Sequence, residues 1–223
     1  LVCTVDKTRT SPAEVAGWMV GRNIDKHRFR RQKTIGKCLL QVNNLSLTSK
    51  DSSQRGRLHD VSFRVHAGEV LGIAGLMGAG RTEVLETIFG AAHGRWQGEV
   101  FLSGKNVKFN HPSEACNAGL VMVPEDRKRL GVFENFNVNE NISLCSLSRT
   151  IRYGFLNRQA EEELVAEAID QIGIKTSSQA ARIKQLSGGN QQKCIISRWL
   201  LTKPKVLLLD DPTRGIDVGA KAD

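Results

Sequence analysis

The sequence predicts an α/β fold built around a parallel sheet, and three features predict it. An apolar segment, residues 69–75, leads into the glycine-rich turn at residues 75–82, which a helix follows. A second apolar segment, residues 206–209, ends in two adjacent aspartates. Segments 38–47 and 61–68 alternate apolar and polar residues, which adds an antiparallel sheet to the prediction.

Length and composition fit one folded domain with a short extension. The chain has 223 residues, of which 40% are hydrophobic and 25% charged. No apolar run in the sequence approaches the roughly 20 residues that span a bilayer. The net charge of +9 attracts phosphate-rich ligands and anionic membrane surfaces, but the aromatic content of 5% does not favour stacking on nucleic acid. The five cysteines form no CxxC pair, and we expect reduced thiols in a cytoplasmic protein.

The first half of the chain is expected to hold one helix before the strands and one after the glycine-rich turn. A Ser-Pro pair predicts the start of a helix over residues 11–19. Residues 49–57 are expected to form the loop between the two antiparallel strands. Residues 69–75 are so uniformly apolar that we expect a buried strand in the middle of a sheet. The helix over residues 81–89 is expected to end at Gly90.

The second half is expected to alternate strands and helices. An amphipathic helix over residues 158–172 is the clearest of them, with Asn157 as its cap and Gly173 at its end. His111 is expected to open a short helix. Apolar runs and turn residues predict the remaining elements: strand 98–104, helix 112–118, strand 120–124, helix 187–202 and strand 206–209.

The glycine-rich turn has the residue types of a phosphate-binding loop. Backbone N–H groups of such a turn, together with the following helix N-terminus, point toward β- and γ-phosphate oxygens. Thr82 is placed to give its hydroxyl to Mg²⁺, whereas Arg81 stands where the pattern has lysine and carries a larger, planar group. The alternative is an ordinary strand-to-helix turn. The residues expected to bind the nucleotide here are Gly75, Gly78, Ala79, Gly80, Arg81 and Thr82.

The acidic pair after residues 206–209 predicts a second part of the same site. Asp210 is expected to bind Mg²⁺, directly or through water. Asp211 stands where a glutamate normally orients the attacking water, and its side chain is one methylene shorter. A displacement of ~1 Å at a reacting group can cost ~100-fold in rate. The alternative is a buried strand that ends in solvated acids.

The segment LSGGNQQK, residues 186–193, is the most specific feature. Ser187, Gly188 and Gly189 stand at a predicted helix N-terminus, where open N–H groups and the positive end of the helix dipole favour an anion. An ordinary N-cap is the alternative. The position of the segment a short helix ahead of the acidic pair favours a second anion site.

In this order and spacing, the three segments resemble those of the ATP-binding cassette (ABC) ATPases. The similarity is closer to one branch, the second nucleotide-binding domain of tandem-cassette monosaccharide importers of bacteria, of the ribose, xylose and galactose type. It covers about residues 38–223, and residues 12–22 resemble the end of a first cassette. The segments that carry it are GLMGAGRTE, VPEDRKRLGV, NENISL, LSGGNQQK and DPTRGIDVGAK.

The resemblance implies an architecture. It is that of a P-loop NTPase of the ABC type, with an antiparallel β subdomain, a RecA-like parallel-sheet core and a helical subdomain at about residues 125–202. Residues 1–37 would be a linker from a preceding cassette, and residues 38–223 a cassette that is incomplete at its C-terminus. Pro124-Glu125-Asp126 stands where this family usually has a glutamine loop.

The resemblance also implies ATP and Mg²⁺ as cofactors and a set of partners. Two cassettes close head to tail, so residues 187–189 would cap the nucleotide of a second cassette. Transmembrane permease subunits would bind the cassette at the cytoplasmic face of the bacterial inner membrane, and a periplasmic sugar-binding protein would act indirectly. No nucleic acid is expected. In this family a histidine completes the hydrolytic site, and no histidine follows His111 in this sequence. We therefore expect weak turnover at this chain's own site, even with Arg81→Lys and Asp211→Glu.

Two other functions stay open at this point. A soluble ABC protein that acts on nucleic acid or ribosomes would suit the charge of +9, although the sequence has no long coiled-coil insertion and no arginine-rich arm within the cassette. A truncated, non-functional remnant would leave sheet edges uncovered.

Overall fold

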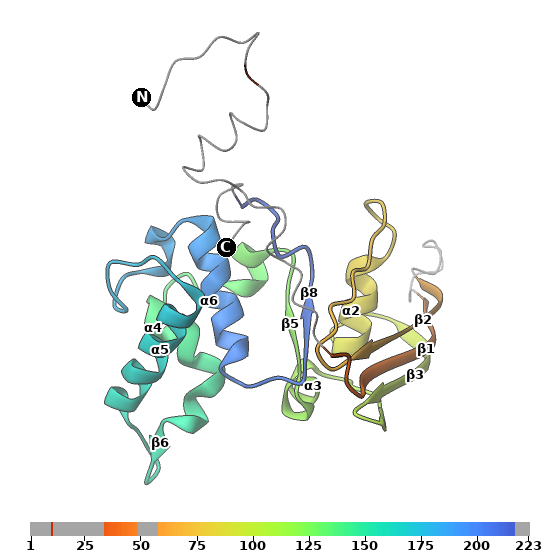
Figure 1. The fold of residues 1–223 in the computed structure, drawn as a ribbon, viewed down its shortest axis with the longest axis horizontal. Coiled ribbons are helices and arrows are strands. Elements are labelled where there is room, and N and C mark those ends of the chain that lie inside the picture. Colours follow the sequence, from red (N-terminus) through yellow and green to blue (C-terminus); the bar gives the residue numbers. More distant parts are fainter. Residues whose placement is uncertain (1–9, 11–33, 49–57, 217–223) are drawn as a thin grey trace.

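The structure is a computed structural model that describes residue 10 and residues 34–48 and 58–216 (Figure 1). The predicted helix over residues 11–19 and the predicted loop over residues 49–57 lie outside the described residues. So does most of the predicted linker, and so does the chain after residue 216.

An antiparallel sheet forms from the alternating segments, as predicted. Its strands are β1 (Cys38–Thr48), β2 (Leu58–His66), β3 (Arg95–Leu102) and β4 (Lys105–Val107), in the order β2-β1-β3-β4. Strand β2 ends earlier than predicted because Glu69 N–H donates to His66 O and turns the chain. Strand β3 begins earlier than predicted because Trp96 pairs with Leu47 of β1.

A register shift in β1 decides which of its residues reach the core. Leu40 and Val42 are buried, and so is Leu45, although an odd-numbered residue would face the other side of a regular strand. Between them the pairing with β2 and β3 shifts, and Asn44 has a φ of 50°. This bulge keeps both apolar ends of β1 on the same face of the sheet.

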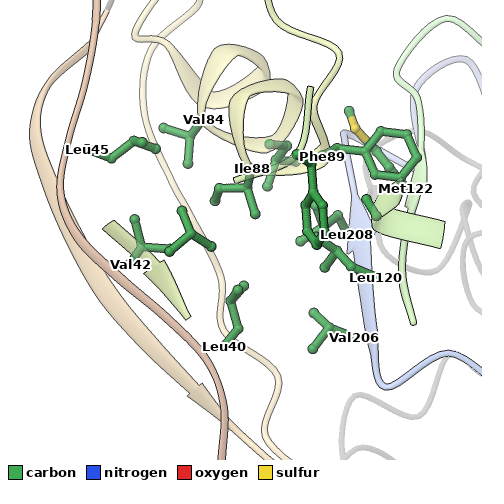
Figure 2. Packing of buried hydrophobic residues seen from close by; sticks show 14 of the residues in the cluster. Leu40, Val42, Leu45, Val84, Ile88, Phe89, Leu120, Met122, Val206 and Leu208 are labelled. Atoms are coloured by element: carbon green, nitrogen blue, oxygen red, sulfur yellow. The ribbon is translucent and has the colours of Figure 1, made fainter. Parts of the chain in front are cut away.

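Helix α2 (Arg81–Phe89) lies between this sheet and a parallel pair of strands, β5 (Leu120–Val123) and β8 (Val206–Leu209). As predicted, α2 ends at Gly90, whose left-handed backbone lets its N–H cap the helix. Figure 2 shows the shared core, with side chains of α2 between those of β1 and those of β5 and β8. The short helix α3 (Pro112–Ala118) is also confirmed, with His111 accepting from Ser113 N–H.

The prediction of a buried strand at residues 69–75 is wrong. Val70 is 96% exposed, and Leu71 and Ile73 are also exposed. No described strand forms a ladder with this segment. It lines instead, together with β8, a cavity of about 390 Å³. Apolar composition favours burial, but a strand also requires a neighbour for its backbone groups, and the described residues give it none.

The helical part lies on the other side of the β5–β8 pair from the antiparallel sheet (Figure 1). Helix α5 (Arg158–Ile172) confirms the predicted range, with Asn157 as cap and Gly173 at its end. A second apolar core includes Val138, Ile142, Val165, Ile183 and Cys194. The elements of this part are η2 (Arg127–Gly131), α4 (Val138–Ser143), η3 (Leu144–Arg149), β6 (Ile151–Arg152), β7 (Phe155–Leu156), α5 (Arg158–Ile172), η4 (Ile183–Gln185) and α6 (Gly188–Leu200).

A buried arginine joins α6 to α4 and to the last residue of η2. Arg198 is 4% exposed and donates from Nε to Asn141 O at 2.5 Å, from Nη2 to Asn141 Oδ1 at 2.9 Å and from Nη1 to Gly131 O at 2.7 Å. The amide of Asn141 in turn donates to Phe133 O and Asn137 O, each at 3.0 Å. This network supplies the hydrogen bonds that a buried cation and buried carbonyls require.

Within the described part of the chain, no helix is long and apolar enough to cross a membrane.

We expect Asn141→Leu to lower the free energy of unfolding by about 2–4 kcal/mol, because it removes one acceptor of the Arg198 guanidinium and the side-chain donor that three carbonyl oxygens share. Chemical denaturation followed by circular dichroism measures this. The control is Arg158→Ala on the exposed first turn of α5, for which a change within about 0.5 kcal/mol is expected. A loss no larger than that of the control would show that the network does not stabilise the helical part.

Candidate functional site

The glycine-rich turn leaves the N-terminus of α2 without a side-chain cap. Gly80 is the N-cap residue with a φ of 88°, and no side chain caps the helix. Gly78 also has a left-handed backbone, with a φ of 80°, and nothing lies within 4 Å of where its Cβ would be. A Cβ at Gly75 would come within 3.1 Å of the Ala79 Cβ. The turn therefore has the open backbone donors and the free space that an anion requires.

Thr82 and Asp210 come together beneath this turn. Asp210, which directly follows β8, is 5% exposed, and the Thr82 side chain lies close enough to its carboxylate to act on its pKa. Burial raises the pKa of Asp210, and hydrogen bonding by the Thr82 hydroxyl opposes this. The negative charges of Glu125 and Asp211 raise the pKa further, whereas Arg81 lowers it. The site thus holds a desolvated carboxylate close to a cation and a hydroxyl.

The residues present fit a magnesium ion bound mainly through its ligand's phosphates and water. Asp210 Oδ2 is buried and has no hydrogen-bond partner. Such an orphaned acceptor beside the hydroxyl of Thr82 suits Mg²⁺, which commonly takes only one or two protein ligands. Among the described residues, no group of three or more His, Cys, Asp and Glu side chains could hold a metal.

Arg81 and Asp211 lie near Asp210. Both border the 390 Å³ cavity that Asp210 also lines. Arg81 is the first residue of α2, and its side-chain carbons lie 3.8 Å from where a Cβ at Gly75 would be. Asp211 is exposed and has a left-handed backbone with a φ of 35°. That conformation turns the chain sharply after β8.

The serine of LSGGNQQK caps α6, as an N-cap residue would. Ser187 Oγ accepts from Asn190 N–H at 3.4 Å and from Asn190 Nδ2 at 3.0 Å. Ser187 is exposed, and its hydroxyl proton can still be donated to a ligand, whereas Gly189 is buried. The cap and an anion site are therefore compatible in this geometry.

The predicted residues form two groups. The first contains Arg81, Thr82, Asp210 and Asp211 beneath the glycine-rich turn. The second, residues 187–189, belongs to the helical part, and no hydrogen bond or ion pair of the described chain joins it to residues 75–82. Figure 1 places the N-terminal ends of α2 and α6 and the carboxyl end of β8 on the same side of the molecule.

Sequence reasoning missed the residues that hold the segment after Asp211. Arg214 pairs with Glu125, and Arg127 donates from Nη1 to Arg214 O at 2.8 Å and from Nη2 to Gly215 O at 3.2 Å. The segment VPEDRKRLGV, which contains Glu125 and Arg127, carries part of the family resemblance in the sequence. Its partners lie almost ninety residues away along the chain, and no local pattern indicates contacts at that separation.

Comparisons with known proteins give the family. The profile of the family "ABC transporter" matches residues 58–214. The chain is 45% identical over 218 residues to the xylose import ATP-binding protein XylG of Photobacterium profundum, covering 98% of this chain and 43% of that protein. It is 43% identical over 214 residues to the ribose import ATP-binding protein RbsA of Oceanobacillus iheyensis, covering 96% of this chain and 42% of that one.

The chain thus spans less than half the length of the curated relatives it matches. Among solved structures, it resembles an ATP-binding cassette in a dimeric post-hydrolysis state with ADP and Pi. The TM-score is 0.67 at 22% identity, with 82% of this chain and 79% of that one covered. A nucleotide-free cassette from an ABC transporter gives a TM-score of 0.65 at 23% identity, with 83% and 73% covered. The chain belongs to the ABC transporter family, and its P-loop α/β fold, with antiparallel, parallel and helical parts, is that of an ATP-binding cassette.

Proposed function

We propose that this chain is the second, C-terminal cassette of the ATP-binding subunit of a bacterial ABC importer for a monosaccharide. The observation that carries the proposal is the pair of Thr82 and Asp210, in which one buried carboxylate oxygen has no hydrogen-bond partner and Thr82 belongs to the helix that follows the glycine-rich turn. The relatives named for xylose and ribose import support the sugar class and favour this function over work on nucleic acid.

At the chain's own site, each residue has a distinct part. The N–H groups at residues 75–82 bind the phosphates, and Arg81 adds positive charge. Thr82 and Asp210 would hold Mg²⁺, which supplies charge neutralisation on the phosphate oxygens when bound. Asp211 would orient the attacking water, but its carboxylate is shorter than that of a glutamate. We infer that this site binds ATP and hydrolyses it weakly.

The main contribution of the chain would be to a second cassette. The Ser187 hydroxyl would donate a hydrogen bond to the nucleotide of that partner. The N-terminal N–H groups of α6 would donate hydrogen bonds to the same nucleotide. Residues before 38 would link the two cassettes, and residues 125–202 would form the subdomain that carries the signature. The assembly would sit at the cytoplasmic face of the membrane on permease subunits fed by a periplasmic sugar-binding protein.

In the full-length protein, we expect Asp210→Asn to weaken MgATP binding at one of two sites by at least about tenfold, because a charge-assisted contact to the metal is lost. Binding of ATP in EDTA should change little. Titration with a fluorescent ATP analogue, with and without Mg²⁺, measures both. Asp170→Asn, an exposed aspartate of α5, is the control. Equal MgATP affinity in Asp210→Asn and in the control would refute the site.

Ser187→Ala is expected to lower ATP hydrolysis by the full-length protein about 10–100-fold while nucleotide affinity is largely kept. The reason is that a hydrogen bond to a charged phosphate is lost at the partner's nucleotide. Asn157→Ala is the matched control, because Asn157 caps α5 in the same way and lies outside the site. If both variants lose the same activity, only the helix cap matters and the proposed role of Ser187 fails.

Without nucleotide and metal, Asp210→Asn should stabilise the protein at pH 7 by about 1 kcal/mol, because a buried, partly unsatisfied carboxylate becomes neutral. Burial raises the pKa of Asp210, so the folded state holds this proton more tightly than the unfolded state. Stability from this group therefore falls as the pH rises from the ordinary aspartate pKa through the raised folded value. The gain in the variant should shrink as the pH is lowered through that window.

Urea denaturation in EDTA at several pH values measures this gain. The control is Asp211→Asn, which replaces an exposed carboxyl one residue away, and its expected effect is within about 0.5 kcal/mol. Lower stability of Asp210→Asn at pH 7 would contradict a destabilising burial of this carboxylate.

A further inference from the structure

Arg127 lies between the segment that follows Asp211 and the start of α6. Its guanidinium donates to two consecutive carbonyl oxygens, those of Arg214 and Gly215, which closely follow Asp211 in sequence. On its other side is the start of α6, because a Cβ at Gly188 would come within 2.6 Å of Arg127 Nη2. One side chain therefore contacts both the segment after β8 and the signature turn.

The Arg127 guanidinium occupies the space that a side chain at position 188 would need. Gly188 does not have a left-handed backbone, so its conformation does not by itself require glycine. The nearest atoms that an added Cβ would meet are Nη2 and Cζ of Arg127, at 2.6 and 3.2 Å, and then Gly215 O at 3.6 Å. The absence of a side chain at Gly188 thus accommodates the guanidinium.

The position of Arg127 is fixed from both ends. The Asp126 side chain accepts from Lys128 N–H and Arg129 N–H, which holds the turn that begins at Arg127. Next to it, Glu125 pairs with Arg214, and the charge of Glu125 also acts on Asp210. Segment 125–127 is consequently tied to residues 214–215, which follow β8, through more than one contact.

We propose that Arg127 is a positioning residue that couples the chain's own nucleotide half-site to the signature it presents to a partner. The inference rests on the proposed function. A shift of the segment after Asp211, when nucleotide and metal bind beneath the turn, moves the two carbonyls that Arg127 holds and thereby the guanidinium against Gly188. The planar fork of arginine serves two adjacent carbonyls, which the single ammonium of lysine cannot do in the same way.

A double-mutant cycle between Thr82 and Arg127 tests the coupling, since the two residues belong to different parts of the site. The measurement is steady-state ATP hydrolysis by the full-length protein with its permease in liposomes. Thr82→Ala is expected to lower kcat several-fold in the unmodified protein. In the Arg127→Ala background, Thr82→Ala should lower kcat by less than twofold further. In the Arg129→Ala background, its full effect should remain, because Arg129 is an exposed arginine of the same turn.

Each outcome decides a different question. If Thr82→Ala changes neither kcat nor MgATP binding in the unmodified protein, the proposed function of the own site fails before the coupling is reached. If it weakens MgATP binding but leaves kcat unchanged, the coupling is overturned while the proposed function stands. If Thr82→Ala has its full effect in both arginine backgrounds, the coupling is overturned while the proposed function stands. Should Arg127→Ala fail to fold by its melting curve, Arg127→Lys replaces it. An Arg127→Lys background in which Thr82→Ala acts as in the unmodified protein overturns the inference.

Discussion

The packing of α2 against β5 and β8 is the constraint on which the site depends. Val84, Ile88 and Phe89 share one core with the apolar residues of β1 on one side and of the parallel strands on the other. Because that core fixes α2, its first turn is held next to the end of β8, and Thr82 reaches Asp210. The glycine-rich turn, which leads into α2, is thereby held near the two residues proposed to bind the metal.

Two buried charges show how a structural and a functional polar group differ. Arg198 is buried, and its guanidinium meets carbonyl and amide oxygens and the Phe133 ring. Asp210 is buried to a similar degree, but one of its oxygens has no partner. The first arrangement stabilises the helical part, and the second leaves a position that a cation can complete.

The elements that could be predicted from the sequence are those that short-range chemistry defines. The cap at Asn157 and the end at Gly173 bound α5 because both act on their own helix, and the same holds for Gly90 and α2. The strand expected at residues 69–75 failed because pairing is a property of the neighbour as well as of the segment. Arg127 and Arg198 escaped prediction because charged residues usually mark solvated surface, and their partners lie far along the chain.

A structure of the full-length protein with Mg²⁺ and a non-hydrolysable ATP analogue would test the central claim most directly. The account predicts the triphosphate against the N–H groups of residues 75–82, the metal between Thr82 and Asp210, and residues 187–189 at the nucleotide of the facing cassette. A nucleotide bound elsewhere, or a metal that touches neither Thr82 nor Asp210, would contradict it.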